Sequence, residues 1–296
     1  MVKRVFLFVL TNIAIMVMVS IVLAVLGQLG VLDVAGGQGG LLVICAVWGF
    51  GASFVSLLLS RWMAKRAMGV HLVGPDVRDA DAQWLYATVS RLAQQANLPM
   101  PEVGIYESPE VNAFATGPSK KRSLVAVSSG LFRSMSKQEI EGVLSHEIAH
   151  VANGDMVTMA LIQGVVNAFV LYLSHIVAMI ARNALSSRDE RGPSFLGVLA
   201  GHAVFIAAQI AFGLIGSMIT AWFSRHREFR ADAGSAQYLG SPTPMVNALS
   251  RLGGVEPGAL PEAIKAFGIT DKAGVMALFS THPPIEQRIA ALQGSR

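Results

Sequence analysis

The 296-residue sequence predicts an α+β membrane protein that is mainly helical, with a small β-sheet and about four transmembrane helices. Two observations support this fold class. Hydrophobic residues make up 53% of the chain and charged residues 14%, whereas soluble domains typically have about 45–50% and 25%. The apolar residues are also concentrated in four long stretches, and a polar block follows each pair of stretches.

The charge pattern argues against a nucleic-acid-binding protein. The net charge is only +4, and Lys and Arg lie beside apolar stretches rather than in a dense basic patch with interleaved aromatic residues. The one cysteine, Cys45, lies within an apolar stretch, so no intrachain disulfide can form, which fits a reducing compartment. We therefore expect no nucleic-acid partner.

The first two apolar stretches predict a transmembrane hairpin at residues 1–61. Val5–Leu26 is long enough to span a bilayer and longer than the apolar part of a cleavable signal peptide. Leu41–Ser60 is the second predicted span. Lys and Arg flank the hairpin at both outer ends and are absent from the Gly-rich connection. The positive-inside rule then places both ends of the hairpin, and the polar block after it, in the cytoplasm.

The second pair of apolar stretches, Met156–Ala181 and Phe195–Phe223, predicts another hairpin at residues 156–223. Both stretches exceed the length of about 18 apolar residues that a transmembrane helix needs. They contain isolated polar residues, including His175 and His202, which we expect to pack between helices or face the aqueous end rather than bind a metal. The charges of the connecting loop are mixed and do not set its orientation. A buried helical pair that never crosses the bilayer is the alternative.

The first polar block, residues 62–155, combines helical and strand patterns. Val77–Asn97 has the periodicity of an amphipathic helix. Three short strands separated by turn residues follow it: Glu102–Tyr106, Asn112–Thr116 and Ser123–Ser128. Ser136 and Glu139 then form the capping-box pattern that begins a helix.

That helix carries the sequence His146-Glu147-Ile148-Ala149-His150, an H-E-x-x-H pattern. At four-residue spacing the two imidazoles lie on one helix face and can bind the same Zn²⁺. The glutamate can take a proton from a metal-bound water. The pattern therefore predicts zinc-dependent peptide hydrolysis by a mainly helical, zincin-like domain with a small β-sheet.

A catalytic zinc needs a third protein ligand and keeps one position for water. The second polar block, residues 224–296, offers Glu228 with Asp232 one helical turn later. We predict that Glu228 is the third ligand of a single zinc per chain, and that Asp232 orients a ligating imidazole through its other ring nitrogen. Two alternatives are a surface ion pair between Glu228 and a neighbouring arginine, and His226 as the third ligand.

The H-E-I-A-H and E-F-R-A-D sequences, framed by four apolar stretches, resemble the HtpX family of membrane metalloproteases, which are bacterial relatives of the CAAX prenyl proteases. The resemblance extends to N-A-F-A at 112–115 and H-P-P at 282–284. It implies a multi-pass zinc endopeptidase of the bacterial inner membrane whose active site faces the cytoplasm. It also implies a stress-controlled role in quality control, with misfolded or damaged membrane proteins as substrates.

Several residues acquire expected roles from this resemblance. His146, His150 and Glu228 match the zinc ligands of the family, and Glu147 matches its catalytic base. His282 matches the H-P-P histidine, which could donate a hydrogen bond to the reaction's oxyanion. It could instead simply precede a helix that begins after two prolines.

Six further residues have weaker expected roles. Asn112, Ala113, Phe114 and Ala115 resemble an edge strand that binds an extended substrate by backbone pairing, although an ordinary strand of small residues is the alternative. Arg288 could support His282 or face solvent. Asp155 could lie in the second coordination sphere of the metal, or end the polar block as a polar stop at the membrane surface.

Two other functions stay open. An intramembrane-cleaving protease needs its metal motif at bilayer depth, and Ser136–Asp155 is too polar for that position. A zinc-binding membrane scaffold or sensor without proteolysis would use a structural zinc site, which usually has four protein ligands, mostly Cys. We expect a membrane-bound zinc endopeptidase in contact with the lipid bilayer. The sequence does not determine its oligomeric state.

Overall fold

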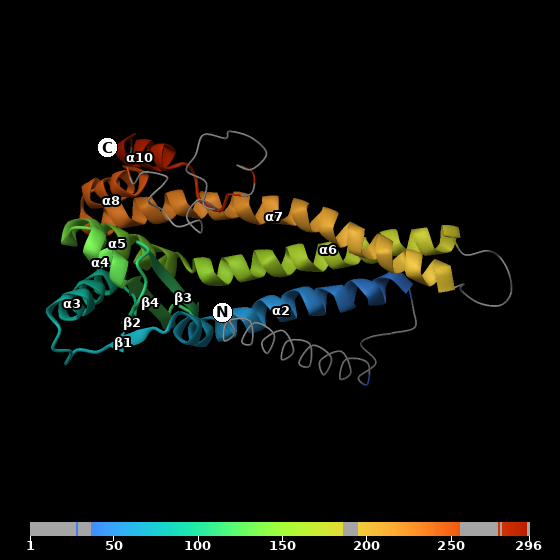
Figure 1. Ribbon diagram of the computed structural model, residues 1–296, viewed down its shortest axis with the longest axis horizontal. Coiled ribbons are helices and arrows are strands. Elements are labelled where there is room, and N and C mark those ends of the chain that lie inside the picture. Colours follow the sequence, from blue (N-terminus) through green and yellow to red (C-terminus); the bar gives the residue numbers. More distant parts are fainter. Residues whose placement is uncertain (1–27, 29–36, 186–194, 255–277, 279, 295–296) are drawn as a thin grey trace. The chain divides into compact units, whose positions relative to one another are not determined.

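In a computed structural model of the chain, residues 28, 37–185, 195–254, 278 and 280–294 are described. The chain divides into two compact units. The first unit contains residues 57–159 and the described part of 221–296. The second contains the described part of 8–56 together with 160–220. Helices predominate and one small sheet is present, which confirms the predicted α+β class (Figure 1).

The sheet belongs to the first unit. Its four strands lie in the order β1 (His71–Val73), β2 (Glu102–Tyr106), β4 (Arg122–Ser128) and β3 (Ala113–Ser119). Strands β2 and β4 are parallel, and each outer strand is antiparallel to its neighbour. The three predicted strands are present, and β3 begins one residue later and ends three residues later than expected. Strand β1 was not predicted, because three residues are too few to show an alternating pattern.

Helices α3 (Ala80–Gln95) and α5 (Lys137–Asn153) form the core of the first unit together with one face of the sheet. Their fully buried side chains recur at helical spacing, and those of β4 alternate along the strand. The main core residues are Leu85, Val89, Leu92, Val103, Val125, Val127, Ile140, Leu144 and Ile148. Truncating one such leucine or isoleucine to alanine typically costs about 2–5 kcal/mol. The other face of the sheet packs against the end of helix α2 (Gly37–Met68).

Helix α5 begins and ends at defined local signals. The predicted capping box is confirmed: Ser136 Oγ accepts from the Glu139 N–H at 3.3 Å, and the Glu139 carboxylate accepts from the Ser136 N–H at 2.7 Å. The helix stops at Gly154, whose φ of 72° favours glycine. Helix α6 (Asp155–Leu185) begins at the next residue, so Asp155 follows the turn directly.

In the second unit, parts of α2, α6 and α7 (Phe195–Leu239) run side by side (Figure 1). Small residues permit close backbone approach between them. A Cβ added to Gly49 would lie 2.5 Å from the backbone nitrogen of Ala168 and 2.7 Å from the carbonyl oxygen of Gly164. A Cβ on Gly216 would lie 2.6 Å from Val166. Close contact at small residues is common between transmembrane helices.

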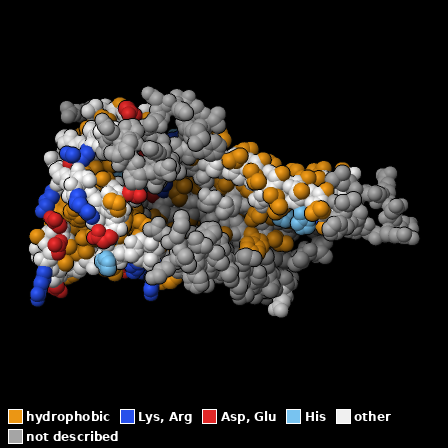
Figure 2. All heavy atoms as spheres, in the orientation of Figure 1, with side chains coloured by type: hydrophobic (Ala, Val, Ile, Leu, Met, Phe, Trp, Pro, Cys, Tyr) orange, Lys and Arg blue, Asp and Glu red, His pale blue; other side chains and the backbone are white. Residues whose placement is uncertain are grey.

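Three helices of the described residues are long and apolar enough to cross a membrane: Gly40–Met68, Asp155–Ala184 and Gly197–Leu239. They expose large apolar side chains, including Leu161, Phe169, Ile180, Ile206, Ile210 and Leu214, and Figure 2 shows such side chains crowded on the surface of the long helices. The predicted first span, Val5–Leu26, and the loop at 186–194 lie outside the described residues. Helix α5 is not among the candidate spans.

Helix α7 is continuous over 45 residues and therefore crosses the predicted boundary between residues 223 and 224. At 1.5 Å per residue such a helix is about 67 Å long, more than twice the thickness of a bilayer's hydrocarbon core. One helix thus contains the last apolar stretch and, farther along, Glu228. Its residues from 221 onward belong to the first unit, together with α5.

Candidate metal centre

Helices α5 and α7 bring the three predicted ligand side chains together. The Nε2 atoms of His146 and His150 lie 3.1 Å apart. Glu228 Oε2 lies 3.4 Å from His146 Nε2, and Glu228 Oε1 lies 3.3 Å from His150 Nε2. A tetrahedral zinc with bonds of about 2.0–2.1 Å separates its ligand atoms by roughly 3.3 Å. The three distances therefore fit a single ion.

The crossing of α5 and α7 is fixed by small residues. Ser145 Oγ donates to the carbonyl of Ser235 at 3.2 Å, and Ser235 Oγ donates back to a carbonyl one turn earlier in α5 at 3.1 Å. A Cβ on Gly234 would lie only 2.9 Å from Ala149 Cβ. Ser235 follows Glu228 by seven residues, two helical turns. The face of α7 that contacts α5 is therefore the face that presents the glutamate.

An aspartate binds the other ring nitrogen of each histidine. His146 Nδ1 lies 2.9 Å from Asp232 Oδ1, and His150 Nδ1 lies 2.7 Å from Asp155 Oδ2. Both aspartates are buried. In the neutral imidazole, an Nδ1–H that donates to its carboxylate leaves the Nε2 lone pair directed at the space between the three side chains. Both histidines are thus held in the tautomer that binds a metal.

An arginine pairs with each aspartate in turn. Arg288, on helix α10 (Ile285–Gly294), binds Asp232 through Nε and Nη2. Arg230 Nη2 donates to Asp155 Oδ1 at 2.6 Å. Arg288 is buried and does not face solvent. Glu228 is also buried, and the neighbouring Arg230 pairs with Asp155 instead.

The carboxylates change the acid–base properties of both histidines. Burial disfavours the protonated imidazole of His146, but hydrogen bonds to Asp232 and Glu228 outweigh this effect and raise its pKa. Burial acts in the same way on His150, and hydrogen bonds to Asp155 and Glu228 raise its pKa to about 10. The site therefore attracts cations, and a metal ion that binds there displaces protons.

Glu228 gives a further test of whether a metal suits this site. Its Oε2 is buried and makes no well-directed hydrogen bond to any described residue. Nitrogen atoms of His146, His282 and Arg288 nevertheless lie 2.9–3.4 Å away. A buried carboxylate oxygen that is not saturated by donors is available as a metal ligand. Two imidazoles and one carboxylate form a donor set that suits a catalytic zinc.

The residues directly before α10 place His282 against Glu228, the predicted third ligand. His282 Nδ1 lies 2.9 Å from Glu228 Oε2. Arg225 Nη1 donates to the carbonyls of Leu278 and Ser280, at 3.3 and 2.7 Å, and thereby ties this segment to α7. Arg225 was not among the predicted site residues. Its only signal was the concentration of arginines directly after the last apolar stretch.

Three other histidines lie outside this group. In His175, His202 and His226, Nδ1 donates to a carbonyl four residues earlier in the same helix, at 2.9 Å in each case. Among the described residues, His146, His150 and Glu228 form the only group of three or more side chains placed to hold a metal. His226 is therefore not positioned as the third ligand.

Of the four residues expected to bind substrate, Ala113, Phe114 and Ala115 begin β3, an edge strand beside α5, and Asn112 directly precedes it. The carbonyl of Asn112 accepts from the Ser128 N–H at 2.9 Å. Bonded and non-bonded pairs alternate along an antiparallel ladder. The N–H and C=O groups of Ala113 and Ala115 therefore point away from β4, toward the open edge. Phe114 packs against the buried residues of one sheet face.

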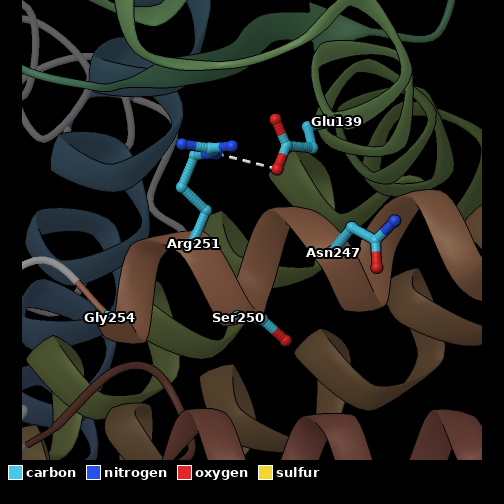
Figure 3. A pocket seen from close by; sticks show the side chains of 5 residues that line it. All are labelled: Glu139, Asn247, Ser250, Arg251 and Gly254. Atoms are coloured by element: carbon cyan, nitrogen blue, oxygen red, sulfur yellow. Dashed lines mark hydrogen bonds and ion pairs between the residues drawn. The ribbon is translucent and has the colours of Figure 1, made fainter.

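An open hollow of about 490 Å³ lies between α5 and α8 (Thr243–Gly254). Its lining residues are Glu139, Asn247, Ser250, Arg251 and Gly254, as Figure 3 shows. Arg251 Nε donates to Glu139 Oε1 at 2.8 Å across one side of it. None of these residues is a predicted metal ligand. We therefore place the candidate site at the α5–α7 crossing and not in this hollow.

Comparisons with known proteins agree with this site. The sequence profile of peptidase family M48 matches residues 79–296. The chain is 51% identical to Protease HtpX of Shewanella frigidimarina (strain NCIMB 400) over 294 residues, which cover 99% of this chain and 100% of that protein. It is 52% identical to the Protease HtpX homolog of Janthinobacterium sp. (strain Marseille) over 292 residues, 98% of this chain and 99% of that protein.

A solved structure shares the fold. Ste24p of S. mikatae superposes with a TM-score of 0.64 at 18% identity, over 99% of this chain and 66% of the Ste24p chain. The family match covers both helices that carry the predicted metal ligands, and the identity to the HtpX proteases extends over the candidate spans as well. The chain therefore belongs to peptidase family M48, in its HtpX group, and is a membrane-bound metalloendopeptidase of bacterial type.

Proposed function

We propose that the metal is one zinc ion per chain, held by His146, His150 and Glu228, and that the enzyme cleaves misfolded or damaged membrane proteins. The observation that carries the proposal is the convergence of three ligand atoms at 3.1–3.4 Å spacing. Two imidazoles and one carboxylate favour zinc over hard cations such as Mg²⁺ or Ca²⁺, which prefer oxygen ligands. The quality-control role is supported by the identity to the HtpX proteases.

In this proposal Glu147 is the general base. A bound zinc would supply Lewis acidity, lowering the pKa of a coordinated water toward about 7 and polarising the scissile carbonyl. Glu147 follows His146 directly and is only partly buried, so water can reach its carboxylate. It accepts the proton of the attacking water and passes it to the leaving amine. Asp232 and Asp155 keep the two imidazoles oriented during this reaction.

His282 is the proposed donor to the oxyanion. Its side chain is 46% exposed, yet its Nδ1 lies 2.9 Å from the buried Glu228. It therefore lies at the border between the metal ligands and the solvent from which a substrate arrives. A ring N–H in this position can donate to the oxygen that becomes negatively charged.

The open edge of β3 is the proposed substrate-binding strand. An extended peptide can pair with the outward N–H and C=O groups of Ala113 and Ala115. Backbone pairing of this kind depends little on the side chains of the substrate, which suits an enzyme that acts on damaged proteins of many sequences. Because β3 lies beside α5, a bound peptide would run close to Glu147.

We further propose that the enzyme lies in the inner membrane with its active site on the cytoplasmic side. Support comes from the positive charges before the first apolar stretch and directly after the second. Reporter fusions after Ser60 and after Arg296 are expected to report cytoplasm, and a fusion within residues 186–193 is expected to report periplasm. A cytoplasmic signal from the last fusion would contradict the second hairpin.

The decisive test compares wild type with Glu147→Gln, purified in detergent with Zn²⁺, on an unfolded protein substrate. Removal of a general base is expected to slow cleavage by about 10²–10⁴-fold, while zinc content stays near one per chain. Glu141→Gln is the matched control, because Glu141 lies on the same helix and pairs with Arg91 at the surface. Equal cleavage by wild type and Glu147→Gln would rule out this base. Cleavage by neither, with zinc bound, would favour the scaffold or sensor.

A further inference from the structure

Each of the two predicted ligand histidines contacts an aspartate, which in turn contacts an arginine. The two side-chain triads are His146–Asp232–Arg288 and His150–Asp155–Arg230, and they differ in the solvent exposure of the arginine. In the first, the arginine side chain is 9% exposed. In the second, it is 55% exposed, although Asp155 itself is 1% exposed. The second histidine is thus coupled through a buried carboxylate to an arginine at the surface.

Asp155 divides its two oxygens between the histidine and the arginine. Oδ2 lies 2.7 Å from His150 Nδ1, and Oδ1 accepts from Arg230 Nη2 at 2.6 Å. Arg227 also contacts Asp155, but it donates to the backbone carbonyl, at 3.1 Å. Among these contacts, Arg230 is the one that directly orients the carboxylate from the side opposite His150. A buried carboxylate without such a partner is costly.

We propose that Arg230 is a positioning residue of the metal centre: by binding Asp155, it holds His150 in its metal-binding orientation and slows loss of the metal. This inference rests on the proposed function, because the orientation of His150 matters only if it is a ligand. Mutation of a residue that orients a metal-binding histidine typically lowers metal affinity by about 10–100-fold. Since Arg230 is more than half exposed, salt screens its ion pair. Retention of the metal therefore depends on ionic strength through Arg230.

The test follows the transfer of zinc from the full-length, zinc-loaded protein in detergent to a chromogenic chelator. Release is measured at low and high NaCl, about 0.05 and 0.5 M, where the screening length differs by roughly threefold. Arg230→Gln is expected to release zinc about 10-fold faster than wild type at low salt, and Arg230→Lys should lie between them. Wild-type release should accelerate with salt, and Arg230→Gln release should not. Arg133 is an exposed arginine on α4 (Ser129–Ser134), so the control variant Arg133→Gln should release zinc at the wild-type rate at both salt concentrations.

A double variant separates positioning from a general effect on the fold. If Arg230 acts through Asp155, then Arg230→Gln combined with Asp155→Asn releases zinc no faster than Asp155→Asn alone; additive acceleration would overturn the inference. Unchanged release from Arg230→Gln would overturn it too. If that variant does not fold, salt-independent release from wild type is the overturning result. Wild type that holds no zinc contradicts the proposed function itself, whereas zinc-loaded wild type with salt-independent release contradicts only the role of Arg230.

Discussion

Arg288 binds both oxygens of Asp232, with Nε 2.8 Å from Oδ2 and Nη2 2.6 Å from Oδ1. The same guanidinium places Nη1 3.3 Å from Glu228 Oε2. All three side chains are buried. One residue of the last described helix therefore contacts both the proposed third ligand, Glu228, and the aspartate that holds His146. Only the planar, five-donor guanidinium of arginine can make these contacts at once.

Substitution of Arg288 is expected to lower both stability and metal content. Breaking a buried ion pair by removing one partner costs about 3–5 kcal/mol, because the other charge is left uncompensated. Arg288→Gln should therefore lower the Tm and the zinc content per chain, measured by elemental mass spectrometry. Arg288→Lys keeps the charge but loses the two-point contact, and should be intermediate. Full zinc content and an unchanged Tm in Arg288→Gln would show that the pair does not support the centre.

The α5–α7 crossing should tolerate only a small residue at position 234. A Cβ there would approach Ala149 Cβ to 2.9 Å, so Gly234→Ala must push the helices apart. We expect this substitution to reduce zinc content, although alanine has a helix propensity about 1 kcal/mol better than glycine. Ala149→Gly combined with Gly234→Ala removes the close contact and should restore zinc. If the single variant binds zinc as wild type does, the close approach is not needed for the site.

The Glu139–Arg251 pair should make the stability of the fold depend on pH in the acid range. Burial raises the pKa of Glu139, but hydrogen bonds from Arg251 and Ser136 outweigh burial and lower it. A carboxylate with a lowered pKa stabilises the folded chain above its unfolded pKa of about 4.3, and this contribution is lost as the pH falls through the folded pKa. The Tm advantage of wild type over Glu139→Gln should thus be constant near neutral pH and shrink below about pH 4. A Tm difference that does not change with pH would contradict the assignment.

Arg225 should act on catalysis through His282. Loss of one oxyanion donor typically lowers kcat by about 10²–10³-fold, and Arg225→Ala should lower kcat because the segment that carries His282 loses its tie to α7. Zinc content and KM should change little. The double variant with His282→Ala should be no slower than His282→Ala alone, and Arg225→Lys should recover part of the rate. If the two substitutions lower kcat independently, so that their factors multiply in the double variant, Arg225 does not position His282.

The open edge of β3 predicts a contrast between two proline substitutions. Ala115→Pro removes an N–H that points to the open edge, so substrate pairing should weaken while the sheet stays intact. Thr116→Pro removes an N–H that points toward β4 and should lower the Tm. We expect a reduced kcat/KM with normal zinc content for Ala115→Pro. Unaltered cleavage by this variant would exclude backbone pairing at that position.

The sequence by itself determined the features that depend on local spacing. Four-residue spacing on one helix places His146 and His150 on the same face, because the periodicity of a helix requires it. The capping-box pattern at Ser136 and Glu139 likewise predicted where this helix begins. The length of the apolar stretches predicted the spans, of which three are candidate spans in the described residues. Strand β1 was missed because its signal is too short. The boundary predicted at residue 224 falls inside α7, because a helix continues across a change from apolar to polar composition.

Only the tertiary structure decided which distant side chains complete the centre. Arg288 and His146 are 142 positions apart in the chain, yet their side chains meet. Arg230, Arg225 and the serine pair at the helix crossing have no motif, since their partners lie on other helices or are backbone carbonyls. Local spacing sets the geometry within one helix. The geometry between helices depends on how their small residues pack, and that packing brings Glu228 to the two histidines.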